Sequence, residues 1–393
     1  MDEFKTFINR KNTNSMKWDQ VKRVFQTDDD DVLPLWVADM DFPAPKEVND
    51  ALIERARHGI YGYTFIDDSI KQNVANWLQK RHGWDVDINW LTFSPSVITS
   101  LYNAIVTFTE PGDNVLIQTP VYTPFFSVIK DSGRQLVENP LRYENGTYRM
   151  DFADLEEKFR QGTKAMVLCS PHNPVGRVWK KAELEKLAEL ALAYDVLILS
   201  DEIHADLVFE PNKHIPIASL SEEMAKQTIT FMSPTKTFNL AGLHISYIVT
   251  PDRKKKMEME KLLALQGFRM LNTMGIIALN AAYEHGDRWL NRLLAVIEEN
   301  KTYVINRLPM ETNGKVDVID SEGTYLLWLD FRKLNMSDKA LHRFLVEEAK
   351  VGLNAGSSYG KEGERFMRIN LACHKETLQE AIDRIVQAVN KLP

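Results

Sequence analysis

Short, nearly continuous apolar runs alternate with amphipathic segments through the middle of the chain. Five of these runs predict strands, and they are "NVLIQTP" from Asn114, "AMVLCSP" from Ala165, "VLILSDE" from Val196, "TITFMSP" from Thr228 and "ISYIVT" from Ile245. Because they are apolar throughout rather than alternating, we expect strands that are covered on both faces. Residues 96–108 and 180–195 carry apolar side chains at helical spacing. This alternation predicts an α/β fold with a mostly parallel sheet and helices on both sides.

The pattern changes in the last quarter of the chain. A long polar helical region near 285–308 precedes the strand-like run "GTYLLWLDF", a helix around 337–349, a second strand-like run "FMRINLA" and a final helix. This order predicts a smaller α+β domain at 286–393 that follows a large domain at 46–285. Residues 1–45 are rich in Pro, Asp and Trp, and we expect an N-terminal arm that joins the smaller domain.

Composition and charge narrow the possible partners. The 393 residues are 44% hydrophobic and 26% charged, with a net charge of -7. An acidic chain without a dense basic run is not expected to bind nucleic acid, and the short runs "RKKK" and "TDDDD" are interpreted as solvated segments. No stretch approaches the roughly 18 apolar residues that a membrane helix needs, and the start lacks the apolar core of a signal peptide. Two cysteines are too few for a disulfide framework, so we expect a reduced, cytoplasmic protein with Cys169 and Cys373 as small buried residues.

Polar side chains follow the predicted strands at their carboxyl ends, where open α/β sheets bind ligands. They supply a ring, an amide, a carboxylate, a hydroxyl and an amine from Tyr122, Asn173, Asp201, Ser233 and Lys236. Singly, each has an ordinary explanation as a packed aromatic, a turn, a helix cap or a surface charge. Ser96 opens a further helix, whose free N–H groups suit a phosphate. Together the set meets the needs of pyridoxal phosphate, which uses a Schiff-base lysine and an acidic partner for its pyridine nitrogen.

These residues stand in motifs that run nearly from end to end of the chain. The motifs are "SMKWD", "LPLWVADMDFPAP", "YGYT", "SPSVI", "TPVYTPF", "SPHNPVGRVW", "SDEIHADL", "SPTKTFNLAGL", "GTYLLWLD" and "FMRINLAC". With them the chain resembles the fold-type I pyridoxal-phosphate enzymes of the aminotransferase class I/II superfamily, and most of all their cystathionine β-lyase (C–S lyase) branch of the MalY/PatB type. The resemblance implies a large domain with a mostly parallel seven-stranded sheet and a smaller α+β domain.

The resemblance also implies the partners of the cofactor ring. Lys236 is expected to form the Schiff base, and a lysine suits this role because its pKa responds to burial and nearby charge. Asp201 is expected to pair with the pyridine nitrogen, Tyr122 to stack on the ring, and Asn173 to reach the ring hydroxyl oxygen. Lys236, Asp201 and Tyr122 are the expected catalytic residues. Glu202 is expected to point to the opposite face of its strand and to pair structurally.

For the phosphate, the resemblance implies a pocket completed by a second subunit. The expected phosphate partners are the hydroxyls of Ser96 and Ser233 and the N–H groups of Val97 and Ile98. Tyr63, in "YGYT", resembles the tyrosine that reaches the phosphate from the neighbouring chain, which implies a homodimer with shared active sites. A packed aromatic is the alternative for Tyr63.

The small-molecule amino-acid substrate has its own expected contacts. Arg368, in "FMRIN", is expected to clamp the α-carboxylate through a bidentate fork, the alternative being a surface ion pair. Asn173 and the backbone from Trp36 to Ala38 are expected to lie near the same carboxylate.

Two histidines depart from the usual aminotransferase pattern. His244 stands where an arginine commonly binds the phosphate, eight residues after the lysine, and His204 stands where a tyrosine is common. We expect His204 either near the ring oxygen or as a satisfied structural histidine, and His172 and His244 as structural residues. No histidine has a zinc-like spacing with other ligands, so no metal is expected.

Three functions are compatible with these residues. The first is a C–S lyase that converts L-cystathionine, or another cysteine S-conjugate, into a thiol such as homocysteine, pyruvate and ammonia. The second is an aminotransferase, which shares every step up to removal of the Cα proton. The third is a regulatory protein that binds another protein on the same scaffold.

Overall fold

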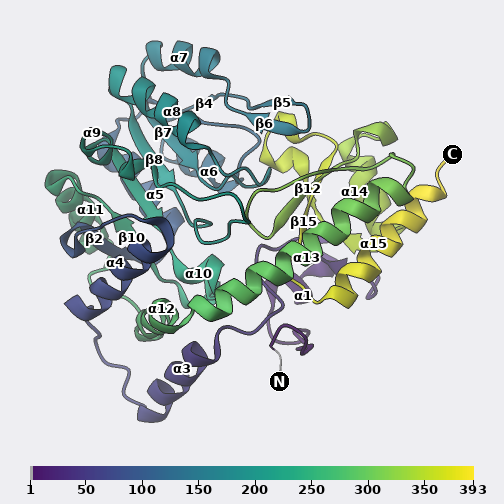
Figure 1. The fold of residues 1–393 in the computed structure, drawn as a ribbon, viewed down its shortest axis with the longest axis horizontal. Coiled ribbons are helices and arrows are strands. Elements are labelled where there is room, and N and C mark those ends of the chain that lie inside the picture. Colours follow the sequence, from purple (N-terminus) through teal and green to yellow (C-terminus); the bar gives the residue numbers. More distant parts are fainter. Residues whose placement is uncertain (1–2) are drawn as a thin grey trace.

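The computed structural model describes residues 3–393, and its largest element is a seven-stranded sheet (Figure 1). In spatial order the strands are β2 (Leu91–Ser94), β10 (Ser246–Val249), β9 (Thr228–Met232), β8 (Leu197–Asp201), β7 (Thr163–Cys169), β3 (Asn114–Ile117) and β4 (Gln135–Glu138). All run parallel except β10, which is antiparallel to both of its neighbours. The predicted mostly parallel sheet is confirmed, and all five predicted strands belong to it.

Helices cover both faces of this sheet. One face carries α5 (Val97–Phe108), α6 (Pro124–Asp131) and α11 (Arg253–Leu265), and the other carries α7 (Phe152–Arg160) and α8 (Lys181–Ala193). Along β7, Ala165 and Val167 pack into the first apolar cluster, whereas Met166 and Leu168 pack into the second. Successive strand residues therefore feed two separate cores, which explains why these strands are apolar at every position.

A smaller antiparallel sheet follows in the C-terminal part of the chain (Figure 1). Its strands in spatial order are β11 (Asp317–Ile319), β12 (Leu326–Asp330), β15 (Phe366–Asn370) and β14 (Asn354–Ala355), and its helices are α13 (Asp287–Glu311), α14 (Asp338–Glu347) and α15 (Lys375–Asn390). The predicted α+β character is confirmed. We propose domain boundaries at 46–285 and 286–393, because the seven-stranded sheet lies wholly within the first range and the four-stranded sheet wholly within the second.

The remaining elements connect these layers. They are α1 (Met16–Asp19), α2 (Val21–Phe25), β1 (Leu33–Pro34), α3 (Lys46–His58), α4 (Asp68–His82), β5 (Arg142–Glu144), β6 (Thr147–Arg149), α9 (Glu222–Lys226), α10 (Pro234–Thr237), α12 (Thr273–His285) and β13 (Val351–Gly352). Short 3₁₀ segments lie at Ile88–Trp90, Ile217–Ser219, Ala241–Leu243, Arg332–Leu334, Gly356–Tyr359 and Lys361–Gly363. Within residues 3–393, no helix combines the length and apolarity needed to cross a membrane.

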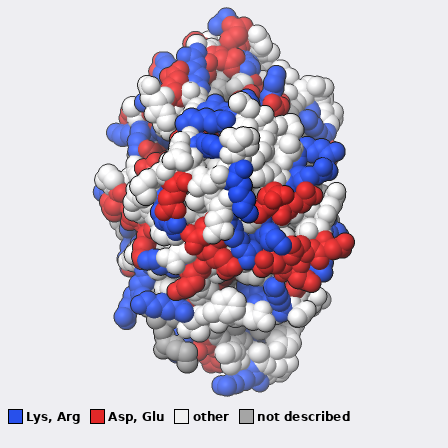
Figure 2. Space-filling view, turned by 90° about the vertical axis from the view of Figure 1, so that its right-hand side faces the viewer, with Lys and Arg blue, Asp and Glu red and all other residues white. Residues whose placement is uncertain are grey.

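One face of the molecule carries charges of both signs. On the face that lies to the right in Figure 1, basic and acidic side chains are interspersed (Figure 2). This face therefore presents no continuous basic surface of the kind that binds nucleic acid.

An ionic cluster within the N-terminal arm holds its first helix against residues 39–41. β1 pairs in parallel with β13, and the arm then turns through residues 36–41. Lys17 is fully buried and donates to Asp41 Oδ2 at 2.6 Å. Asp41 also accepts from Trp18 Nε1 at 2.9 Å and from Arg10 Nη1 at 2.7 Å. The arm thus has a buried charge pair at its centre.

We expect the substitution Asp41→Ala to lower the free energy of unfolding by about 3–5 kcal/mol, because it removes the only carboxylate within hydrogen-bond distance of the buried Lys17 amine among the described residues and leaves Asp39 at 3.9 Å. Asp50→Ala, which removes the carboxylate of an exposed ion pair with Lys46, is the control and is expected to leave stability nearly unchanged. Urea unfolding of the apoprotein measures both variants. Equal effects of the two substitutions would contradict this view of the arm.

Candidate active site

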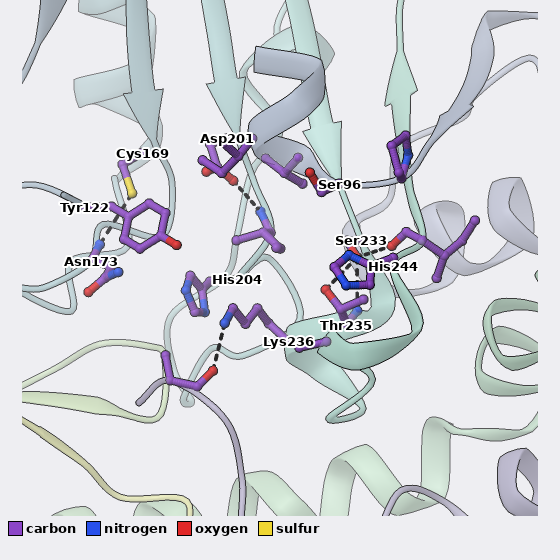
Figure 3. A pocket seen from close by; sticks show the side chains of 17 residues that line it. Ser96, Tyr122, Cys169, Asn173, Asp201, His204, Ser233, Thr235, Lys236 and His244 are labelled. Atoms are coloured by element: carbon purple, nitrogen blue, oxygen red, sulfur yellow. Dashed lines mark hydrogen bonds between the residues drawn. The ribbon is translucent and has the colours of Figure 1, made fainter. Parts of the chain in front are cut away.

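A cavity of about 180 Å³ lies where β7, β8 and β9 end and where α5 and α10 begin (Figure 3). Most of the predicted site residues line it, and these are Ala38, Ser96, Val97, Ile98, Tyr122, Asn173, Asp201, His204, Ser233 and Lys236. They come from six separate segments of the chain. The parallel strands bring them together because their carboxyl ends all lie at one edge of the sheet.

Lys236 extends from α10 into this cavity. Its Nζ donates to the carbonyl oxygen of Ala38 at 2.7 Å (Figure 3). Burial, together with the nearby charge of Arg368, lowers the pKa of Lys236 from 10.5 to about 8. A minority of this amine, roughly one fifth, is therefore neutral near physiological pH, far more than for an exposed lysine, and this suits a nucleophile or a proton acceptor.

Asp201 is the last residue of β8 and is buried in the cavity wall. Its Oδ1 accepts from the backbone N–H of Ile203 at 3.1 Å. Burial raises the pKa of Asp201 to about 7, so a cationic partner in the cavity would favour its charged form. Glu202 instead accepts from His214 at 2.7 Å and from Ser200 at 2.8 Å. The expectation that Glu202 pairs structurally, away from Asp201, is confirmed.

The far end of the cavity is built from two helix N-termini. Ser96 caps α5 by accepting from Thr99 N at 3.1 Å, and Val97 and Ile98 form the first turn of that helix. Their N–H groups precede the first intrahelical hydrogen bond and are suited to an anion. Ser233 caps α10, but its hydroxyl donates to the carbonyl oxygen of Ile245 at 2.7 Å.

Among the wall residues that were not predicted from the sequence, Thr235 and Cys169 carry functional groups that could contact a ligand. Thr235 adds a second hydroxyl next to Ser233, with the two oxygens 2.7 Å apart. The "SPTK" motif contains this residue, so its position between Ser233 and Lys236 was the available signal. Cys169 also lines the cavity, although its expected burial is confirmed. Burial strongly raises the pKa of the Cys169 thiol, which keeps it protonated.

Arg368 lies beside the cavity rather than on the protein surface. It is only 3% exposed, which excludes the alternative of a surface ion pair. Its Nη1 donates to Asn173 Oδ1 at 3.1 Å and its Nη2 to the carbonyl oxygen of Trp36 at 2.8 Å. Its Nε has no hydrogen-bond partner among the described residues. The backbone carbonyl of Trp36 thus holds the Arg368 guanidinium, and the Nε of Arg368 remains available as a donor.

The three histidines of the motifs have different surroundings. His172 donates from Nε2 to the carbonyl oxygen of Pro120 at 2.8 Å and is structural, as predicted. His244, also predicted to be structural, lies in the cavity wall and has a left-handed backbone (φ 48°). His204 lines the cavity, and its buried Nδ1 has no partner among the described residues. Burial lowers the pKa of His204 to about 3 and keeps it neutral.

Tyr63 is the predicted site residue that the structure does not bring to the cavity. Its side chain is 93% exposed, so it is not a packed aromatic within this chain. Ile60, Tyr61 and Phe65 in the same segment are also exposed. They form a stretch of apolar side chains on the surface of the single chain.

Comparison with known proteins defines the class of this chain. The family described as "Aminotransferase class I and II" matches residues 30–385, and the chain belongs to it. It is 43% identical to the cystathionine beta-lyase PatB of Bacillus subtilis, over 97% of this chain and 98% of that protein. It is 32% identical to protein MalY of Escherichia coli, over 99% of each.

Solved structures with the same fold also include pyridoxal-phosphate enzymes. Cystalysin from Treponema denticola, which contains a pyridoxal 5'-phosphate cofactor, superposes with a TM-score of 0.95 at 37% identity, covering 99% of each chain. The PLP-bound C–S lyase from Staphylococcus hominis, in complex with L-cycloserine, gives a TM-score of 0.91 at 30% identity, covering 98% of each chain. The chain therefore has the architecture of a fold-type I pyridoxal-phosphate enzyme.

The residues of this cavity fit pyridoxal phosphate. A buried amine, a buried carboxylate and a helix N-terminus lie around one space, and they match an aldehyde, a pyridine nitrogen and a phosphate respectively. The unpartnered Nδ1 of His204 and the unpartnered Nε of Arg368 leave polar atoms for further ligand contacts. Within residues 3–393, no group of three His, Cys, Asp or Glu side chains is placed to hold a metal ion.

The lowered pKa of Lys236 gives a testable pH dependence. Only the neutral amine reacts with acetic anhydride, so we expect half-maximal acetylation of Lys236 in the apoprotein near pH 8. Arg368→Met removes a cation that lowers this pKa, and its midpoint is expected at higher pH. Competitive labelling from pH 6 to 11 with peptide mass spectrometry measures both. A wild-type midpoint near 10.5, or a downward shift in the variant, would contradict this description of the site.

Proposed function

We propose that this chain is a pyridoxal-phosphate-dependent C–S β-lyase that cleaves L-cystathionine and other cysteine S-conjugates to a thiol, pyruvate and ammonia. The observation that carries the proposal is a buried lysine and a buried aspartate at one strand-end cavity. This pair occurs in a chain that matches a cystathionine beta-lyase along 97% of its length.

Each part of the cofactor has a proposed partner on the chain. Lys236 holds the aldehyde carbon, Asp201 the pyridine nitrogen, Asn173 the ring hydroxyl oxygen and Tyr122 one face of the ring. The phosphate partners are Ser96, Val97, Ile98, Ser233 and, from the cavity wall, Thr235. His204 is proposed near the ring oxygen, since its buried Nδ1 lacks a protein partner.

The chain then supplies proton transfer and orientation. When bound, pyridoxal phosphate withdraws electrons from the Cα of the attached amino acid. The amino group of the substrate would take the place of Lys236 on the aldehyde carbon, and the freed Lys236 amine would then remove the Cα proton, for which a pKa of about 8 is well matched to neutral pH. The Cβ–S bond then breaks and its electrons leave with the sulfur as a thiolate, which takes up a proton. The remaining three-carbon fragment reacts with one water molecule and ends as pyruvate and ammonia.

Arg368 is proposed to orient the substrate through its α-carboxylate. Its guanidinium is buried next to the cavity and retains an unpartnered Nε donor. Asn173 and the Trp36 carbonyl fix two of its other nitrogens. A guanidinium held in this way presents a planar fork, which matches a carboxylate better than a flexible ammonium does.

Transamination is the second candidate, because the matching family includes aminotransferases. It is favoured by a 27% identity with an aspartate aminotransferase of Pyrococcus abyssi over 92% of the chain. His204 and His244, where tyrosine and arginine are common in aminotransferases, favour the lyase. Formation of pyridoxamine phosphate from an amino acid without a leaving group on Cβ would favour transamination instead. No feature of the described residues favours the regulatory role.

We also propose a cytoplasmic homodimer in which Tyr63 completes the phosphate site of its partner. The exposed Tyr63, with its exposed neighbours Ile60, Tyr61 and Phe65, supports an interface at this segment. Both cysteines are free and buried, which supports a reducing compartment.

Replacement of Lys236 tests the lyase proposal. Lys236→Ala is expected to lower the rate of pyruvate and thiol release from L-cystathionine by at least about 10² to 10⁴-fold, the contribution typical of a positioned proton acceptor. Lys226→Ala, at an exposed ion pair with Glu222, is the control and is expected to retain full activity. No pyruvate from the cofactor-loaded wild-type protein, or an active Lys236→Ala variant, would overturn the proposal.

Subunit mixing tests the shared site. We expect Tyr63→Ala and Lys236→Ala homodimers each to have low activity, whereas their hybrid contains one site with both native residues. With random pairing, half of the dimers are hybrids with one of two sites intact, so co-expressed chains are expected to reach about one quarter of wild-type activity. Full activity of Tyr63→Ala alone, or no recovery in isolated hybrids, would exclude this role of Tyr63.

A further inference from the structure

The helix that carries Lys236 is too short to fix this residue by itself. α10 has four residues, Pro234–Thr237, and begins directly after β9. A single helical turn has little stability of its own, so its side chains depend on tertiary contacts. At the start of the turn, Ser233 supplies a cap and a bond to the Ile245 carbonyl.

At the end of α10, the side chain of Thr237 is held by a buried carboxylate. Its Oγ1 donates to Asp206 Oδ2 at 2.8 Å, and both residues are buried. The other oxygen of Asp206 accepts from Trp77 Nε1 and from His82 Nε2, each at 3.0 Å. Although burial alone would raise the pKa of Asp206, the hydrogen bond and charge of His82 and the other donors keep it lowered. A charged acceptor therefore receives three directed donors.

Asp206 belongs to the same turn as two residues of the cavity. This turn starts at Asp201, contains His204 and is closed by the backbone bonds Ala205 N to Glu202 O and Leu207 N to His204 O, both 2.9 Å. The Asp206 carboxylate thus joins the turn after β8 to the turn after β9. The turn after β9 carries Lys236, and the turn after β8 carries Asp201 and His204.

We propose that Asp206 is a positioning residue that, through Thr237, fixes the Lys236 amine relative to Asp201 and His204. Asp206 is absent from the lining of the cavity, so it acts through its neighbours rather than on the substrate. The inference rests on the proposed role of Lys236 as the reacting amine. A loss of this bond would leave substrate binding by Arg368 intact and would change the geometry of proton transfer.

The test compares Thr237→Ser with Thr237→Ala in the cofactor-loaded protein, because these variants differ only by the hydroxyl. With L-cystathionine, Thr237→Ala is expected to lower kcat by about 10-fold to 100-fold, the range for a slightly misplaced reacting group, with KM within about twofold. The pH midpoint of the visible cofactor absorbance is expected to shift in Thr237→Ala and to stay near wild type in Thr237→Ser. Thr237→Val, which keeps the side-chain volume, is expected to follow Thr237→Ala.

Thr228→Val is the matched control, because Thr228 is also buried and its hydroxyl donates to the Met224 carbonyl at 2.8 Å, away from the cavity. It is expected to keep kcat and the absorbance midpoint. The inference about Asp206 would be overturned if Thr237→Ala and Thr237→Ser had the same kcat and the same absorbance midpoint. It would also be overturned if Thr228→Val lowered kcat as much as Thr237→Ala does. Either result would leave the proposed lyase function standing. A wild-type protein without cofactor absorbance or lyase activity would overturn the proposed function as well.

Discussion

Burial of the Lys236 amine without a carboxylate partner is the constraint on which this site depends. Among residues 3–393, the amine has one hydrogen-bond acceptor, the carbonyl of Ala38, and no ion pair. Burial disfavours the charged ammonium form of Lys236 because it removes the charge from water, and the pKa of Lys236 is therefore lowered. For Asp201 the charged form is also disfavoured, because its buried carboxylate accepts one hydrogen bond, from the Ile203 N–H, and burial raises its pKa. Two groups whose pKa values are displaced toward neutrality at one cavity indicate a place for chemistry rather than for stability.

The rest of the structure keeps these groups in place without neutralising them. The sheet sets the position of Asp201 through β8, which is paired with β7 and β9 along its length. The N-terminal arm brings the Ala38 carbonyl to the amine, and the smaller sheet brings Arg368 to the neighbouring Trp36 carbonyl. Nearly every one of these contacts joins residues that are far apart in the sequence. The site is therefore a property of the packed chain, and local segments alone could not form it.

The sequence predicted what depends on local pattern and on strand order. The apolar runs identified β3, β7, β8, β9 and β10, and the residues after them gave Asn173, Asp201 and Lys236. It did not mark β2 and β4, the two edge strands, since β4 is partly exposed and lacks a continuous apolar run. It also missed side chains whose partners come from distant elements, such as Asp206 with Trp77 and Lys17 with Asp41. The place of His244 in the cavity wall was not predicted either, because its motif does not reveal a backbone turn at positive φ.

The most direct measurement is the identity of the residue that carries the cofactor. The protein is incubated with pyridoxal phosphate, reduced with borohydride and digested, and its peptides are then sequenced by mass spectrometry. The account predicts a phosphopyridoxyl group on Lys236, in the peptide that contains "SPTKTFNLAGL", with no such group on exposed lysines at comparable yield. A modification confined to other lysines, or none on Lys236 under conditions in which the protein is folded, would contradict it.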